Sequence, residues 1–146
     1  MPTFVVADEF KKYLAISDIT LKDATHSFKL FLTASTPAKA TTTVKADLTP
    51  ISSAGGYTEK TLTTTFAETG AGTGIWRFSG GADQTWTASG AAFDAFRYVV
   101  LYDDTPAATP TDPIVGWWDT GGTQNIADGS SFTLNLDADF AILEIN

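Results

Sequence analysis

The sequence predicts a mainly β domain, an antiparallel β-sandwich or open barrel of about eight short strands behind one short N-terminal helix. Apolar and polar residues alternate in short segments along most of the chain, which is the period of a strand with one buried face. Turn-forming Gly, Asp and Ser residues separate these segments. The 146 residues suffice for one core, and no linker divides them, so we expect a single domain over residues 1–146.

A helix is predicted over about residues 5–15. Val6, Phe10 and Leu14 recur four residues apart and would share one face. Two acidic residues stand early in the segment and two lysines stand later, the order that the helix dipole favours. The segment therefore has an apolar face to place against the rest of the domain.

The strands are predicted from period-two alternation, with β-branched threonine supporting strand over helix. "FRYVVLY" is apolar on both faces and is expected at the centre of a sheet. "SSAGGY", "ETGAGTG" and "ADGS" are predicted turns. In chain order, the predicted strand segments are "SFKLFLT", "TTTVKADLT", "YTEKTLTTTFAE", "GIWRFSG", "DQTWTAS", "FRYVVLY", "PIVGWW", "SSFTLNLD" and "FAILEIN".

Charge is distributed unevenly along the chain. Residues 1–60 hold seven lysines and six acidic residues, whereas residues 61–146 hold two arginines and eleven acidic residues, and the net charge is −8. An acidic surface of this kind is repelled by phosphate backbones, so we expect no nucleic-acid partner. The acidic surface indicates either ordinary solubility or a face that binds a basic surface of a partner.

Composition also limits the compartment and the available chemistry. The chain contains no cysteine, so it has neither disulfides nor thiolate metal sites. No apolar run reaches the roughly 18 to 20 residues of a membrane-spanning helix, and the start "MPTFVVADEFKK" does not have the pattern of a signal peptide. We expect synthesis in the cytoplasm and no membrane partner.

No pattern in the sequence predicts an enzyme. His26 is the single histidine and is expected in a surface loop, and "GAGTGI" lacks the spacing and the following helix of a dinucleotide loop. The acidic pairs Asp103/Asp104 and Asp137/Asp139 do not form the ligand string of an EF-hand and are interpreted as solvated turns, with a structural calcium as the alternative. We expect no catalytic residue, cofactor or metal.

The four tryptophans are candidates for a sugar-stacking platform. Trp117 and Trp118 are adjacent, so in a strand they point to opposite faces and at least one enters the core. The other would be an edge contact, a subunit interface or a platform.

The order of "DEFKKYLA", "FKLFLTAS", "FRYVVLYDDTP", "DPIVGWWDTGG" and "ADGSSFTLNLD" resembles a family of small virion proteins of tailed bacteriophages. The resemblance covers most of the chain in order; it is most specific over residues 96–137 and loose over residues 35–90. Trp117 and Trp118 depart from it, because that family more often has Gly-Tyr there.

The resemblance implies a non-enzymatic capsid decoration or cement protein on the exterior of the virion, with a tail or head-tail accessory protein as an alternative. Its implied partners are the major capsid protein and copies of itself, most simply in a homotrimer. Unpaired sheet edges would suit strand addition by a neighbouring subunit. The other alternative is a carbohydrate-binding or receptor-binding β-sandwich.

Contacts with partners are expected in residues 2–14 and in the loop 103–113. The candidate interface residues are Phe4, Val5, Phe10, Asp103, Asp104, Pro106, Pro110, Trp117 and Trp118.

Overall fold

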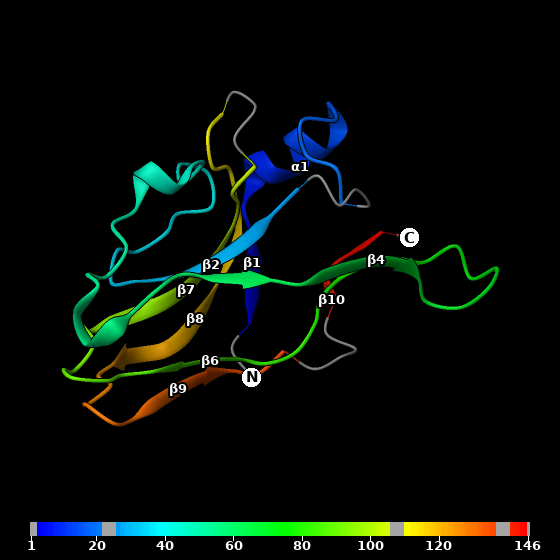
Figure 1. Cartoon of the computed structure of the whole chain (residues 1–146). Helices are drawn as coiled ribbons and strands as arrows, with labels where there is room; N and C mark the ends of the chain where they lie inside the picture. Colours follow the sequence, from blue (N-terminus) through cyan, green and yellow to red (C-terminus); the bar gives the residue numbers. More distant parts are fainter. Residues whose placement is uncertain (1–2, 22–25, 106–109, 137–140, 146) are drawn as a thin grey trace.

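The computed structural model describes residues 3–21, 26–105, 110–136 and 141–145. The predicted fold class is confirmed, because these residues form a mainly β fold of antiparallel sheets with one short N-terminal helix (Figure 1). They contain ten strands in sheets of five, three and two strands.

The five-stranded sheet has the order β1-β8-β7-β2-β3. β7 lies in its middle and is buried along almost its whole length, which confirms the central position predicted for "FRYVVLY". The strands are β1 (Phe4–Val6), β8 (Ile114–Gln124), β7 (Phe96–Asp103), β2 (Phe28–Thr33) and β3 (Lys60–Leu62).

Two smaller sheets supply the second layer. One has the order β10-β5-β4, and the other pairs β6 with β9. Aromatic rings of the two layers contact each other: the ring centroids of Phe28 and Phe78 are 5.0 Å apart, and those of Phe96 and Phe132 are also 5.0 Å apart. The result is sandwich-like. The strands of the two smaller sheets are β4 (Thr64–Glu68), β5 (Trp76–Gly80), β6 (Gln84–Thr87), β9 (Ser131–Leu134) and β10 (Ala141–Ile145).

The N-terminal helix is shorter than predicted. α1 spans Asp8–Ala15 and buries Phe10 and Tyr13. The residues before it form β1 because they pair with β8, and the backbone N–H of Ala7 donates to the carbonyl of Val115 at 3.0 Å. Sheet pairing therefore overrides the helical spacing of Val6 with Phe10. None of the helices in the described ranges is long and apolar enough to cross a bilayer.

The strand predicted in "TTTVKADLT" is wrong. Residues Lys45–Asp47 form a short 3₁₀ helix, η1. The Asp47 carboxylate accepts the backbone N–H groups of Thr43 at 2.8 Å and Val44 at 3.0 Å, and these bonds lower the pKa of Asp47. The side chain thus satisfies donors that a sheet would otherwise bind. A second 3₁₀ turn, η2, spans Ala54–Gly56 within the predicted turn "SSAGGY".

The predicted segment "YTEKTLTTTFAE" is divided between two sheets. β3 pairs with β2, whereas β4 pairs with β5. The change of partner occurs at Thr63, whose carbonyl accepts the N–H of Gly81 at 2.8 Å. One extended segment therefore borders both layers.

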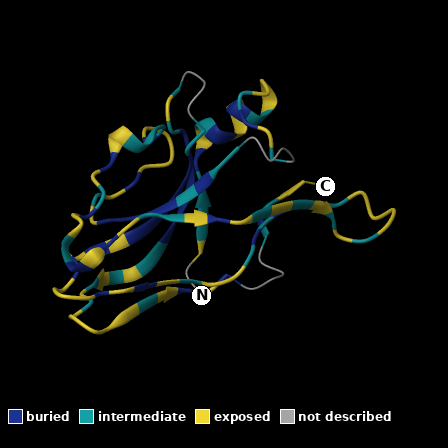
Figure 2. Ribbon diagram, in the orientation of Figure 1, coloured by how far each residue is buried: buried dark blue, intermediate teal, exposed yellow. Residues whose placement is uncertain are grey.

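Gly116 allows β1 to lie against β8. A Cβ at this position would be 2.3 Å from the Val5 carbonyl oxygen and 2.5 Å from Cζ of Phe4. Phe4 lies on Trp118, with 4.4 Å between ring centroids. Most of the five-stranded sheet is buried, and exposure increases along the projecting β4–β5 hairpin (Figure 2).

Candidate functional site

Four of the candidate interface residues lie inside the chain. Phe10 and Trp118 are 0% exposed, Asp103 is 2% exposed and Trp117 is 5% exposed. In this conformation they present no surface to a partner.

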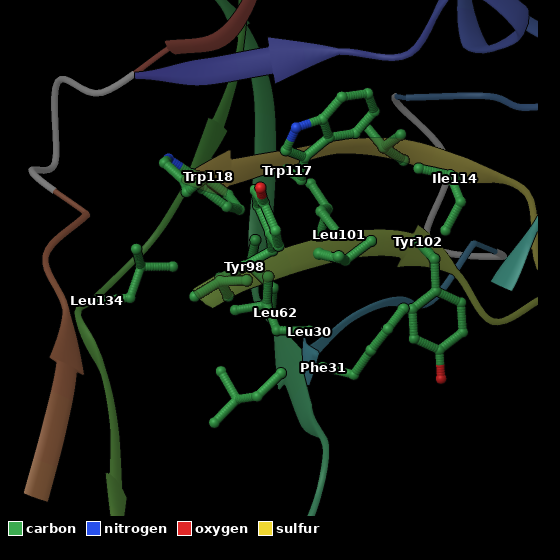
Figure 3. Packing of buried hydrophobic residues seen from close by; sticks show 14 of the residues in the cluster. Leu30, Phe31, Leu62, Tyr98, Leu101, Tyr102, Ile114, Trp117, Trp118 and Leu134 are labelled. Atoms are coloured by element: carbon green, nitrogen blue, oxygen red, sulfur yellow. The ribbon is translucent and has the colours of Figure 1, made fainter. Parts of the chain in front are cut away.

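The paired tryptophans occupy opposite faces, as predicted from their adjacency. On β7, Val99 lies opposite Trp118 and Val100 lies opposite Trp117. Both project from β8 among the buried hydrophobic residues of the core (Figure 3). The expectation that one of them remains available as a platform is therefore wrong for this conformation.

The remaining candidates lie nearer the surface. Phe4 and Val5 are half-buried in β1, and Asp104 is half-buried in an ion pair with Lys29. Pro110 lines a small cavity. Pro106 lies outside the described residues.

His26 is not the surface residue that the sequence suggested. Its side chain is 14% exposed, and its Nδ1 lies 2.5 Å from Oδ2 of Asp103. The other carboxylate oxygen of Asp103 accepts the backbone N–H of Thr105 at 3.0 Å and also its hydroxyl. The pair could not be found from sequence because 77 positions separate its members.

His26 lines two cavities, and Asp103 lines the smaller of them. One, of about 530 Å³, is lined by Leu21, residues 26–28 and residues 61–66. The other, of about 140 Å³, is lined by residues that include Tyr13, Asp18 and Pro110. A histidine held by a carboxylate is the orienting half of a catalytic triad.

The arrangement does not include the nucleophile of such a triad. Within the described ranges, His26 hydrogen-bonds to Asp103 and to no serine or threonine hydroxyl. The backbone of neighbouring Ser27 is held by Thr105 Oγ at 3.0 Å and by the N–H of Asp104 at 2.7 Å. The arrangement therefore acts as a clamp that fixes the chain before β2 to the end of β7.

A second polar cluster lies on the other face of the large sheet. Lys45 Nζ is 2.7 Å from one Glu59 oxygen and 3.0 Å from the Tyr102 hydroxyl, which donates to Glu59 at 2.5 Å. Burial, followed by the nearby Glu59 carboxylate, raises the pKa of Tyr102. The three groups bind one another, and none of them lines the two cavities described above.

Metal binding receives no support from the described part of the chain, where no group of three or more His, Cys, Asp or Glu residues is arranged to hold an ion. Asp137 and Asp139, the alternative calcium ligands, lie outside the described residues.

Two of the three exposed large apolar residues in the described ranges, Trp76 and Ile145, lie at the end of the three-stranded sheet; the third is Ile16. Register places Phe66 opposite Phe78, and Ile145 opposite Trp76, on one face. Trp76 is 40% exposed and Ile145 is 46% exposed. Phe66 stacks on Trp76, with 5.4 Å between centroids and 23° between planes. We call Phe66, Trp76, Leu143 and Ile145 the tip strip.

The opposite face of this sheet carries charged, polar and small residues. Arg77 Nε donates to Glu144 Oε2 at 2.9 Å, and Thr65 and Ala67 are exposed. The alternation in "GIWRFSG" and "FAILEIN" indicated two-faced strands, but their pairing across 67 positions was not predictable from sequence.

Comparisons with protein-family models, with curated proteins and with solved structures found no match to this chain.

Proposed function

We propose that the protein is a non-enzymatic structural protein of a tailed-phage virion, a decoration protein that binds the assembled head and stabilises it. The proposal starts from the resemblance over residues 96–137. These residues include β7 and β8, the two longest strands, which form the centre of the large sheet.

The tip strip is the observation that carries the proposal. It combines an exposed tryptophan and an exposed isoleucine on a sheet that projects from the body (Figure 1). Exposed aromatic and aliphatic side chains in one patch are typical of protein contacts. By contrast, His26 is bound to Asp103, and Lys45, Glu59 and Tyr102 bind one another, so a contact surface accounts for the molecule better than a reaction centre does.

Charge and symmetry extend the proposal. We place the acidic surface outward, away from packaged DNA, because a net charge of −8 is repelled by phosphates. A homotrimer at a local symmetry axis would multiply one modest contact into a durable attachment. A position on the tail or at the head-tail junction would use the same surface.

Co-sedimentation with undecorated heads of the cognate phage tests the proposal. We expect saturable binding, with a copy number that matches the symmetry axes of the shell. A Trp76→Ser/Ile145→Ser double variant should bind at least about tenfold more weakly, because it removes the centre of the contact. Ile16→Ser is the matched control, since Ile16 is 55% exposed but lies after α1, outside the tip strip. Absence of binding to heads would contradict the decoration role.

A carbohydrate-binding or receptor-binding module is the second candidate, because Trp76 with Phe66 forms one exposed aromatic pair. Soluble oligosaccharides should then quench the Trp76 fluorescence. Under the decoration proposal they should not.

A further inference from the structure

The outer edge of β4 is a second feature that a binding protein can use. Antiparallel strands direct the N–H and C=O groups of alternate residues to alternate sides. Thr63 O accepts the N–H of Gly81, so residues 63, 65 and 67 face β5. The backbone groups of Thr64, Phe66 and Glu68 therefore point away from β5.

These groups point toward the side on which β2 lies. Leu32 O accepts the N–H of Ile51, so the even residues of β2 face away from β7. They face β3, where Phe28 lies opposite Leu62. Residues 60 and 62 thus face β2, and by alternation Thr64, Phe66 and Glu68 face the same side.

β2 does not extend far enough to cover them. Its first residue is Phe28, which pairs with Leu62 at the end of β3, so β2 starts beside β3. Ser27 O accepts the N–H of Asp104 and the His26 side chain binds Asp103, so both residues are held at the end of β7. Among the described residues, no strand pairs with β4 on this side. The cavity of about 530 Å³ lies here, between residues 26–28 and residues 61–66.

We propose that this cavity, the β4 slot, binds an extended peptide segment of another protein as an additional strand along β4. The five residues of β4 span about 17 Å and offer three N–H and three C=O groups to such a strand. Residues 26–28 bound the far side. The slot therefore fits one isolated strand, whereas the edge strand of a second copy would bring its own sheet into these residues.

The side chains indicate the chemistry of the segment. Phe66 and Glu68 share one face of β4, so a matching strand places an apolar residue beside Phe66 and a basic residue beside Glu68. A basic segment also suits a chain with a net charge of −8. The identity of the partner as an arm of a shell protein rests on the proposed function, but the slot itself does not.

Selection of peptides from a random library against the full chain tests the slot. Recovered peptides should alternate apolar and polar residues and carry a basic residue at one end. Their dissociation constants would be measured by fluorescence anisotropy. Thr64→Pro should weaken binding about tenfold, because it removes a donor that points into the slot. Proline is tolerated where an edge N–H faces outward, and circular dichroism would verify the fold.

A second variant keeps the test independent of that proline. Glu68→Gln retains the oxygen that accepts the N–H of Gly74 at 2.7 Å but removes the charge, so basic peptides should bind several-fold more weakly. Thr65→Ala is the matched control: this side chain is exposed on the opposite face, and binding should not change.

Amide hydrogen exchange supplies the structural readout. Bound peptide should slow exchange at residues 64, 66 and 68, while residues 65 and 67 are already slow because they bind β5. Failure to recover any peptide, or equal binding to folded Thr64→Pro, would overturn the slot. Heads that bind Thr64→Pro as tightly as the parent protein would show that the head contact lies elsewhere and leave the decoration role standing. Peptide binding without head binding would support the β4 slot and contradict the decoration role.

Discussion

Replacing Gly116 by alanine tests how β1 is held. The new Cβ would lie 2.3 Å from the backbone oxygen of Val5 and 2.5 Å from the Phe4 ring. A backbone oxygen can move only if β1 moves, so the relief of this overlap separates β1 from β8. Forced overpacking costs about 1–3 kcal/mol, and the lost ring contact of Phe4 with Trp118 adds about 0.5–1.5 kcal/mol.

We therefore expect Gly116→Ala to lower the free energy of unfolding by about 2–4 kcal/mol. With a urea dependence of about 2 kcal/mol per molar, the midpoint falls by about 1–2 M. Equilibrium unfolding followed by tryptophan fluorescence measures this shift. The native emission should also move to longer wavelength, because Trp118 loses its cover.

Gly122→Ala is the matched control in the same strand. A Cβ there meets no atom within 4 Å, so the free energy of unfolding should stay within about 0.5 kcal/mol of that of the parent protein. Equal midpoints for the two glycine variants would refute the contact between β1 and Gly116.

Three further outcomes are expected. His26→Ala should lower the free energy of unfolding by about 2–3 kcal/mol, because the buried Asp103 carboxylate loses a partner. In urea titrations, the effect of His26→Ala should be smaller when Asp103 is already replaced by Asn. Burial raises the pKa of Tyr57, so the unfolded chain loses this proton at lower pH than the folded chain does, and stability should fall as the pH rises above about 10. Tyr57→Phe should flatten that decline. The same variant should lower the free energy of unfolding by about 1–3 kcal/mol, because the Leu32 N–H loses its acceptor. In acrylamide quenching, Trp76→Phe should remove most of the accessible fluorescence, since Trp76 is the one tryptophan among the exposed large apolar residues.

Strand positions were predictable wherever the local pattern and the final environment agree. "FRYVVLY" is apolar on both faces, and β7 lies between two neighbours in the large sheet. "ADGS" supplies Gly129 with a φ of 78°, which a turn requires. These features depend on residues close in sequence, so their physics is visible there.

The secondary-structure predictions are wrong where a partner distant in sequence, or a side chain, decides the backbone conformation. Val6 has helical spacing, but pairing with β8 makes it a strand residue. Val44 and Leu48 have strand spacing, but the Asp47 carboxylate captures the local donors and turns the chain. Neither competing bond leaves a periodic signal in the sequence.

The candidate sites depended even more on distant pairing. The tip strip requires β5 to lie beside β10, and the clamp requires His26 to meet Asp103. The sequence distinguishes tryptophans only by type, whereas the fold buries Trp117 and Trp118 and exposes Trp76. Residue type alone does not distinguish a core aromatic from a contact aromatic.

The passage of residues 60–68 between the sheets explains why β4 has an edge that no strand of the described residues covers. A strand that pairs with β2 on one side and then with β5 on the other satisfies only half of its backbone groups at each step. Within the described residues, β2 begins at Phe28 opposite Leu62, so it starts beside β3 and leaves this side of β4 without a neighbouring strand. Natural sheets usually cover or blunt such edges. His26 lines the β4 slot, so we expect His26→Ala to change peptide binding there as well as stability.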